Sequence, residues 1–201
     1  GGMPTGTNCC YNWSKAHIPD DKFEACTGDY LHQTQVKKSK ACFGCPVHCS
    51  HWLEVKKGPY AGTKGEGCEW KRHAEAFKMG IFDQEWMTLN NNICNQLGFD
   101  INGPGGSIAW AMECFEKGIL TEEDTDGLKL NWGNQKAATQ LTYDMAYRRG
   151  FGSILADGPL AASRKIGRDS EKWVNFGKGG CEARYDHRWG YGWVLGQALS
   201  T

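Results

Sequence analysis

Three cysteines lie close together in the segment KACFGCPVHCSHW, where Cys42, Cys45 and Cys49 follow the pattern C-x2-C-x3-C. Such short spacings let one loop supply several thiolate ligands to an iron–sulfur cluster or to zinc. A zinc ribbon needs a second C-x2-C pair, which the sequence lacks, and a haem attachment site needs a histidine where Pro46 follows Cys45. The pattern therefore predicts three ligands of a [4Fe–4S] cluster. Three unligated core cysteines are the structural alternative.

A four-iron cluster bound by cysteines needs a fourth thiolate. Cys68, Cys94 and Cys181 lie near glycines and are candidates. Cys114 falls close to the core face of a predicted helix, which favours a packing role. The spacing does not choose among the other three.

The composition excludes several other classes of function. Lys+Arg and Asp+Glu are both 23, so the net charge of zero favours neither nucleic acid nor an anionic membrane as partner. No apolar run approaches the roughly 18 residues of a membrane span, and GGMPTGTNCC does not resemble a signal peptide. Ten cysteines without a secretory signal predict a reducing compartment and a cytoplasmic protein. The opening Gly-Gly and the abrupt end lead us to expect an internal fragment of a longer chain.

The elements that must position the cysteines change in character along the chain. We expect an irregular segment over residues 1–67, which carries the cysteine run, and a mainly helical region over residues 68–201. Apolar periodicity, N-cap residues and closing glycines predict four helices. These run from Asp83 to Gly98, Ser107 to Gly118, Asn134 to Gly150 and Pro159 to Gly167. A short strand is expected within residues 171–180.

Several separate motifs follow the cysteine run in a recognisable order: GPYAGTKGEGCEW, CNQLGFDINGPGGSIAWAMECFEKG, LADGPLAASRKIG and YDHRWGYGWVLGQALST. Together they resemble the central and later part of the tungsten-containing aldehyde ferredoxin oxidoreductase family. The resemblance implies a mainly α fold, formed by helical domains 2 and 3 of such an enzyme. The N-terminal β domain would be absent from this fragment.

The resemblance also implies the cofactors. They are tungsten, or more rarely molybdenum, held by two pyranopterins, with Mg²⁺ bridging the pterin phosphates and one [4Fe–4S] cluster beside them. Family members take the fourth cluster cysteine from a D-x-x-G-x-C motif. This motif does not occur here, so we expect the fourth ligand beyond Thr201.

A pterin-binding motif of the form D-x-x-G-L-D is matched by NQLGFD, with Asn95, Gly98 and Asp100 at the cofactor-binding positions. Asn95 replaces an acid and Phe99 a leucine. An amide oxygen and a carboxylate can both accept hydrogen bonds from pterin N–H groups. Taken without the resemblance, the same residues form an ordinary helix C-cap.

The catalytic acid/base groups of the family match less well. Glu69 in EGCEWK is the best match to a glutamate near the metal. The segment YDHR places Tyr185 where the family has a histidine, and His187 two residues later. Either could move a proton, and His187 would need the least tuning of its pKa. A hydrogen-bonded cluster around Tyr185 is the alternative.

Two enzymatic functions follow from the resemblance, together with one non-catalytic function. The first is oxidation of small aldehydes to carboxylic acids, with ferredoxin or an iron–sulfur subunit as electron acceptor in a homo- or hetero-oligomer. The alternative is the catalytic subunit of an ATP-independent benzoyl-CoA reductase, which reduces an aromatic acyl-CoA. There a cysteine would bind tungsten, and His17, His32 or His73 would supply the proton. A non-catalytic iron–sulfur electron-transfer module is the third hypothesis.

Overall fold

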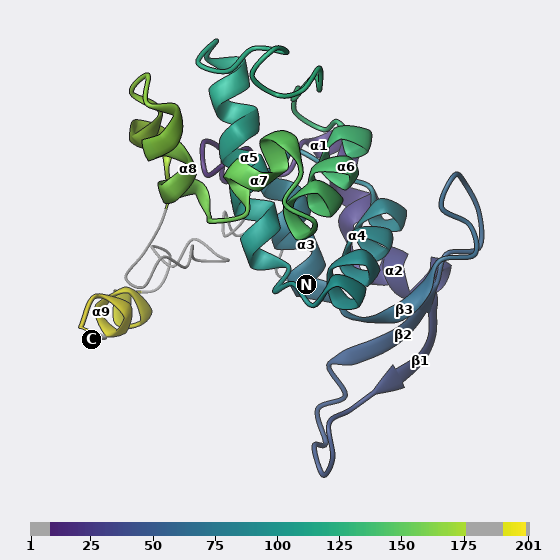
Figure 1. Ribbon diagram of the computed structural model, residues 1–201. Helices are drawn as coiled ribbons and strands as arrows, with labels where there is room; N and C mark the ends of the chain where they lie inside the picture. Colours follow the sequence, from purple (N-terminus) through teal and green to yellow (C-terminus); the bar gives the residue numbers. More distant parts are fainter. Residues whose placement is uncertain (1–8, 176–190, 200–201) are drawn as a thin grey trace.

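The computed structural model describes residues 9–175 and 191–199 and consists mainly of helices (Figure 1). This confirms the predicted mainly α class. Its elements are, in chain order, α1 (Asp20–Phe23), η2 (Glu24–Cys26), α2 (Gly28–Thr34), β1 (Val36–Lys40), β2 (Ser50–Glu54), β3 (Lys64–Cys68), α3 (Glu69–Lys78), α4 (Gln84–Leu97), α5 (Asn102–Glu116), α6 (Gln135–Ala146), α7 (Gly150–Leu155), α8 (Pro159–Ile166), η3 (Ser170–Trp173) and α9 (Tyr191–Leu199). Within the described ranges, every helix is too short or too polar to cross a membrane.

A small antiparallel sheet extends away from the helices, with strand order β1-β2-β3 (Figure 1). Ser50 on β2 pairs with Lys40 on β1 and with Cys68 on β3. The loop of residues 41–49, which carries the three clustered cysteines, lies at the free end of this sheet. We call the sheet and this loop together the hairpin arm.

The opposite end of the hairpin arm is tied to the helices. The hydroxyl of Tyr60, in the turn between β2 and β3, donates a hydrogen bond to the side-chain oxygen of Gln135 at the start of α6. The Gln135 amide then donates to Asp83 Oδ2 over 2.9 Å. Since Asp83 caps α4, this chain of contacts joins the sheet to the first turn of that helix.

Helix α4 forms where its end signals predict it. Asp83 accepts a hydrogen bond from the Trp86 amide over 3.0 Å, as an N-cap residue does. The helix ends at Gly98, whose φ of 73° is left-handed, and the Phe99 amide returns to the Cys94 carbonyl over 2.9 Å. The prediction from Asp83 to Gly98 is confirmed.

Two other helices depart from their predicted ends. Helix α5 begins at Asn102 and not at Ser107, because Pro104 falls in the first turn, where the missing N–H costs no helical hydrogen bond. Helix α6 ends at Ala146 and not at Gly150, because Arg148 adopts a φ of 50° that a right-handed helix cannot contain.

The last part of the helical region corrects one prediction and confirms another. Helix α8 spans Pro159–Ile166 with Pro159 in its first turn, as expected. The strand expected within residues 171–180 is wrong for the described part, because the 3₁₀ helix η3 covers Ser170–Trp173. The indole N–H of Trp110 donates to the Ser170 carbonyl over 3.1 Å and fixes this turn against α5.

Residues 9–67 contain more regular structure than the sequence predicts. The outer strand β1 reads VKKSK and is mostly exposed, so it lacks the alternation of apolar and polar residues that signals a strand. Strand β3 crosses the expected boundary between residues 67 and 68. The division of the chain at this position therefore stays a prediction.

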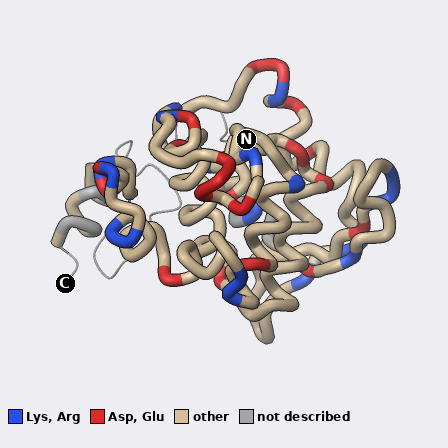
Figure 2. The backbone as a smooth tube through the Cα atoms, turned by 45° about the horizontal axis from the view of Figure 1, so that its top comes forward, with Lys and Arg blue, Asp and Glu red and all other residues tan. Residues whose placement is uncertain are grey.

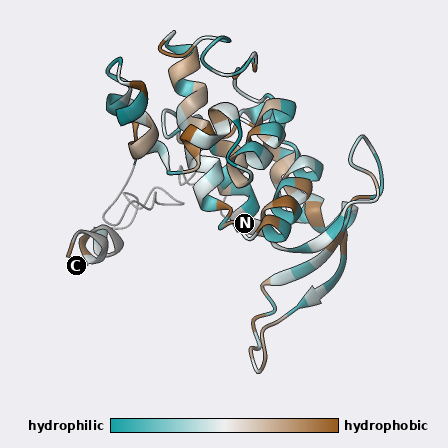
Figure 3. Cartoon of the chain, in the orientation of Figure 1, coloured by the Kyte–Doolittle hydropathy of each residue, from teal (hydrophilic) through white to brown (hydrophobic). Residues whose placement is uncertain are grey.

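The helices enclose one apolar core that centres on α4 and α5 (Figure 3). Trp86 and Trp110 are fully buried, and the Trp86 indole donates to Thr139 Oγ1 over 3.0 Å. Burial of each large apolar side chain contributes about 1.5–3 kcal/mol. Side chains from several helices and from the segment before α6 complete the core, among them Phe77, Met87, Ile108, Met112, Leu130, Leu141, Phe151 and Leu155.

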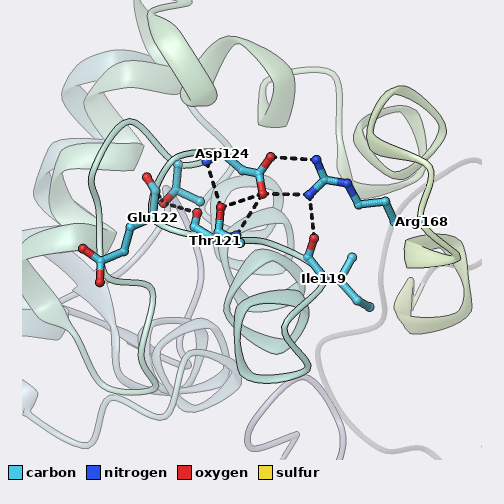
Figure 4. A network of polar contacts seen from close by, with 6 residues as sticks. Ile119, Thr121, Glu122, Asp124 and Arg168 are labelled. Carbon is cyan, nitrogen blue, oxygen red and sulfur yellow. Dashed lines mark hydrogen bonds and ion pairs between the residues drawn. The ribbon is translucent and has the colours of Figure 1, made fainter.

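Charged residues of both signs are spread along the chain (Figure 2). In one exposed contact, the guanidinium of Arg168 donates to both carboxylate oxygens of Asp124, over 2.7 and 2.9 Å (Figure 4). Hydrogen bonding from Arg168, and next from the Thr121 amide, holds the pKa of Asp124 well below its usual range. This ion pair joins the segment after α5 to the turn after α8.

Candidate functional site

The cysteine loop at the tip of the hairpin arm is open to solvent. Cys42 and Cys49 are exposed and Cys45 is half-buried, and all three thiols are free. The Cys45 amide donates to the Cys42 carbonyl over 3.0 Å, so the first two cysteines flank a tight turn, in which Gly44 has a φ of +71°. A loop of this kind presents several thiols toward one ligand.

Three accessible thiols on one loop suit an iron–sulfur cluster better than they suit a packed core. Across residues 9–175 and 191–199, however, no three His, Cys, Asp or Glu side chains are arranged to hold a metal ion. The ligand role of Cys42, Cys45 and Cys49 therefore stays a prediction, supported by their exposure and chemistry.

The buried cysteines are chemically different from those of the loop. Burial raises the pKa of Cys94 to about 12, and the charges of Glu75 and Asp100 act in the same direction. Burial also raises the pKa of Cys114 to about 12. Since a cluster binds the thiolate, these environments weigh against both residues as the fourth ligand. The backbone of Cys68 pairs with Ser50 next to the loop, whereas Cys181 lies outside the described residues.

Glu66 joins the cysteine loop to the candidate pterin motif. Its carboxylate accepts hydrogen bonds from Lys40 and, over 3.0 Å, from Ser50, the residues at the two ends of the loop. Its backbone carbonyl accepts hydrogen bonds from the side-chain amides of Asn91 (2.8 Å) and Asn95 (3.4 Å) on α4. One residue of EGCEWK therefore contacts both other motifs, although 16 residues separate it from Ser50 and 29 from Asn95.

This contact also sets the charge state of Glu66. The hydrogen bond from Lys40 is the largest influence, and the bond from Ser50 adds to it, so that the pKa of Glu66 lies below its usual value. Burial is the second-largest influence on this pKa and acts in the opposite direction, but it does not outweigh the hydrogen bonds and the charge of Lys40. Glu66 is therefore an anion at neutral pH, paired with the Lys40 cation.

The NQLGFD motif lies at the exposed C-terminal end of α4. Asn95, Gly98 and Asp100 are all exposed, and a Cβ atom built on Gly98 would meet no atom within 4 Å. Asp100 Oδ1 accepts a hydrogen bond from the Asn102 amide over 3.0 Å, which leads the chain into α5. The three residues thus share an open surface that a planar ligand can approach, and their cofactor role stays a prediction.

The candidate acid/base residues are placed only in part. Residue 69 is the first of α3, directly after β3, and its side chain is not among the described groups. Tyr185 and His187 lie outside the described residues. The structure therefore brings the strand residues that flank the cysteine loop together with EGCEWK and NQLGFD, and it does not test where YDHR lies.

The sequence model of a known family, "Aldehyde ferredoxin oxidoreductase, domains 2 & 3", matches residues 3–201. The chain belongs to the aldehyde ferredoxin oxidoreductase family. This match confirms the resemblance drawn from the motifs, including the assignment to domains 2 and 3.

Individual members of the aldehyde ferredoxin oxidoreductase family show the same relationship. The chain is 33% identical over 156 residues to the aliphatic sulfonate oxidoreductase, WOR-like subunit, of Pyrococcus furiosus, covering 77% of this chain and 24% of the relative. It is 33% identical over 153 residues to a tungsten-containing aldehyde ferredoxin oxidoreductase of Thermococcus kodakarensis, covering 75% and 24%. The match thus spans about a quarter of the relatives' length.

A solved structure supports the fold of this family member. The active-site complex BamBC of benzoyl coenzyme A reductase, bound to 1,5-dienoyl-CoA, aligns with a TM-score of 0.72. The alignment covers 88% of this chain and 26% of that chain, at 21% sequence identity. At this identity the likeness establishes a shared fold.

Sequence reasoning missed a group of buried polar residues on α3 of this family member. Arg72, Glu75 and Lys78 are at most 1% exposed. Lys78 Nζ lies 3.3 Å from Glu75 Oε1 and donates to Asn102 Oδ1 over 3.4 Å. The segment EWKRHAEAFK has the composition of a solvated helix, so composition gave no signal of burial. The absence of an N-cap signal before it also concealed the helix.

The same helix carries a buried histidine. His73 is 3% exposed, and its ring stacks on Phe77 with centroids 5.5 Å apart and an interplanar angle of 4°. Burial, and next the positive charge of Arg72, lowers the pKa of His73 to about 4. The imidazole is therefore neutral at physiological pH.

Proposed function

We propose that the protein containing this chain is a tungsten-dependent, low-potential oxidoreductase that oxidises aldehydes to carboxylic acids. The observation that carries this proposal is the contact of Glu66 with Lys40 and Ser50, which flank the cysteine loop, and with Asn95. An enzyme of this kind needs its electron outlet and its organic cofactor held at a fixed separation. Family membership and the tungsten-containing relatives support the cofactor assignment.

Three sets of residues have separate roles in this proposal. Cys42, Cys45 and Cys49 would hold a [4Fe–4S] cluster, with a fourth cysteine supplied from elsewhere in the protein. Asn95 and Asp100 would accept hydrogen bonds from a pterin that approaches the open surface at Gly98. The tungsten (or molybdenum) bis-pyranopterin, with Mg²⁺ on its phosphates, would supply the two-electron redox chemistry.

Glu69 would orient water and accept a proton, with Tyr185 or His187 as the second acid/base group. The overall reaction converts an aldehyde and water to a carboxylic acid, two electrons and two protons. Ferredoxin or an iron–sulfur subunit of a homo- or hetero-oligomer would take the electrons one at a time. The protein's own contribution is to position the substrate and to provide a route for the protons.

Reduction of an aromatic acyl-CoA is the second candidate function. The departures in EGCEWK and YDHR favour it, since Lys71 and Tyr185 stand where an aldehyde-oxidising member has an acid and a histidine. This function calls for a cysteine near tungsten. Because Cys9, Cys10 and Cys94 are buried, Cys68 and Cys181 are the better candidates for that thiolate.

The test uses the full-length native protein. Mass spectrometry would quantify tungsten, molybdenum and iron, and dye-linked assays with viologen would follow oxidation of aldehydes and of a cyclic dienoyl-CoA. We expect tungsten, about four iron atoms per cluster and aldehyde oxidation. Activity on the thioester alone would favour the second candidate. Zinc in place of tungsten, molybdenum and iron would contradict both.

A pair of cysteine variants tests the cluster separately. Cys45→Ala should lose iron, because it removes a loop thiol. Cys26→Ala is the matched control, since Cys26 is a buried thiol that donates to the Phe82 carbonyl over 3.6 Å, and this variant should retain iron. Equal iron in both proteins would contradict the ligand assignment.

A further inference from the structure

Helix α3 contains an imidazole that packing does not explain. Neither nitrogen of His73 has a hydrogen-bond partner among the described residues, although the ring is 3% exposed. A neutral imidazole has one donor and one acceptor nitrogen, and leaving both unsatisfied in the interior is unfavourable. A phenylalanine would stack on Phe77 without this cost. The two nitrogens therefore point to partners other than the side chains that the structure describes.

The position of His73 on α3 suggests a function for these partners. Residue 73 follows residue 69 by one helical turn, and positions i and i+4 lie on the same face of a helix. The other two histidines considered as proton sources, His17 and His32, are exposed. Of these three histidines, His73 alone is buried.

We propose that His73 is a proton-relay residue that carries protons between Glu69 and internal water. This inference rests on the proposed function, in which Glu69 accepts a proton as the aldehyde is oxidised. One imidazole nitrogen would take this proton from the Glu69 carboxylic acid while the other nitrogen gives its own proton to water. Glu69 returns to the carboxylate and His73 remains neutral, so the step moves one proton and no electrons.

The electrostatics of the site support a relay. The pKa of His73 is lowered to about 4, so the buried ring is neutral at rest and has one nitrogen free to accept a proton while the other gives one up. Burial, and next the positive charge of Arg72, keeps the resting ring neutral, and the Gln84 side chain has a smaller influence in the opposite direction.

The decisive variant is His73→Phe in the full-length protein, which keeps a stacked ring and removes both nitrogens. We expect tungsten and iron contents and thermal stability at neutral pH to be at least those of the wild type. We expect kcat to fall at least tenfold with KM unchanged, and the solvent deuterium isotope effect on kcat to change. Imidazole added to His73→Ala should restore part of the lost kcat. Tyr147→Phe, at an exposed ring with no role in the proposed site, is the control and should behave as the wild type.

A crystal structure of the wild-type protein gives a readout independent of activity. We expect an ordered water or a carboxylate oxygen within hydrogen-bond distance of each His73 nitrogen. A dry ring with two unpartnered nitrogens would overturn the relay, as would a His73→Phe protein with wild-type kcat and isotope effect. A wild-type protein that is loaded with tungsten but oxidises no aldehyde would instead overturn the proposed function, and the relay with it.

Discussion

The hairpin arm and the helical core are stabilised in different ways. The core buries Trp86, Trp110 and many aliphatic side chains completely, whereas the arm exposes Phe43 and Val47 at its tip. The arm depends instead on ladder hydrogen bonds and on lysine–glutamate pairs such as Lys37–Glu54, 2.7 Å apart. The region that carries Cys42, Cys45 and Cys49, the predicted cluster ligands, is thus less well packed at its tip than the core is. The helical core can therefore determine the fold, while the arm remains available to bind a group such as a cluster.

The largest effect should come from the core. Trp110→Ala removes a fully buried ring and its hydrogen bond to Ser170, and we expect a loss of about 3–5 kcal/mol. Amide hydrogen exchange of α5 in the full-length protein measures this loss as easier opening. Trp52→Ala, at a ring 37% exposed in the arm, is the matched control and should cost less than 1 kcal/mol. Similar losses of stability in the two variants would contradict the difference between the core and the arm.

The next effect concerns pH. Because the pKa of His73 is lowered to about 4 in the folded protein, the unfolded chain binds more protons between about pH 6.5 and 4. Stability should therefore fall as the pH is lowered through this window, by at most about 3 kcal/mol. His73→Phe should lose this part of the pH dependence of unfolding. An unchanged pH dependence in the variant would show that the histidine titrates normally.

A smaller effect is expected at the start of α4. Asp83→Ala removes the N-cap hydrogen bond to the Trp86 amide and the contact with Gln135, and we expect a loss of about 1 kcal/mol. Asn134→Ala removes the comparable cap of α6, where the side chain accepts from the Ala137 amide over 3.2 Å. A larger loss for Asp83 than for Asn134 would measure the additional contact with Gln135. Equal losses would show that this contact adds nothing.

The smallest effect on global stability should come from the arm. Glu66→Gln weakens an exposed ion pair, so we expect less than about 0.5 kcal/mol, but faster amide exchange over residues 36–54. Because the pKa of Glu66 is lowered, its contribution should be present above its ordinary pKa and lost as the pH falls through the folded value. Glu54→Gln, which affects Lys37 and Lys64, is the control and should leave the cysteine loop unchanged.

The sequence predicts those parts of the fold that depend on local signals. Asp83, Gly98 and Pro159 mark helix ends because caps, left-handed glycines and first-turn prolines act within a few residues. Helix α3 could not be predicted in this way, since its charged residues are buried through contacts with distant segments. Strand β1 was concealed for the same reason, because its place in the sheet depends on pairing with β2.

The same distinction between local and long-range signals applies to the candidate site. The spacing of Cys42, Cys45 and Cys49 and the motif NQLGFD could be read directly, since each is contiguous. The role of Glu66 could not, because its carboxylate and its carbonyl contact residues from opposite directions along the chain. His73 could be considered as a proton source from its residue type, but its burial required the structure.

The sheet is held to α4 at two separate points. One is the Tyr60–Gln135–Asp83 chain at the first turn of the helix, and the other is the Glu66 carbonyl, bound by Asn91 and Asn95 near its last turns. A body fixed at one point can rotate about it in every direction, whereas a body fixed at two points can rotate only about the line that joins them. The two contacts therefore restrict the sheet to one axis of rotation relative to α4. The cysteine loop lies beyond both contacts, so its distance from the helix can change by bending of the strands at the tip.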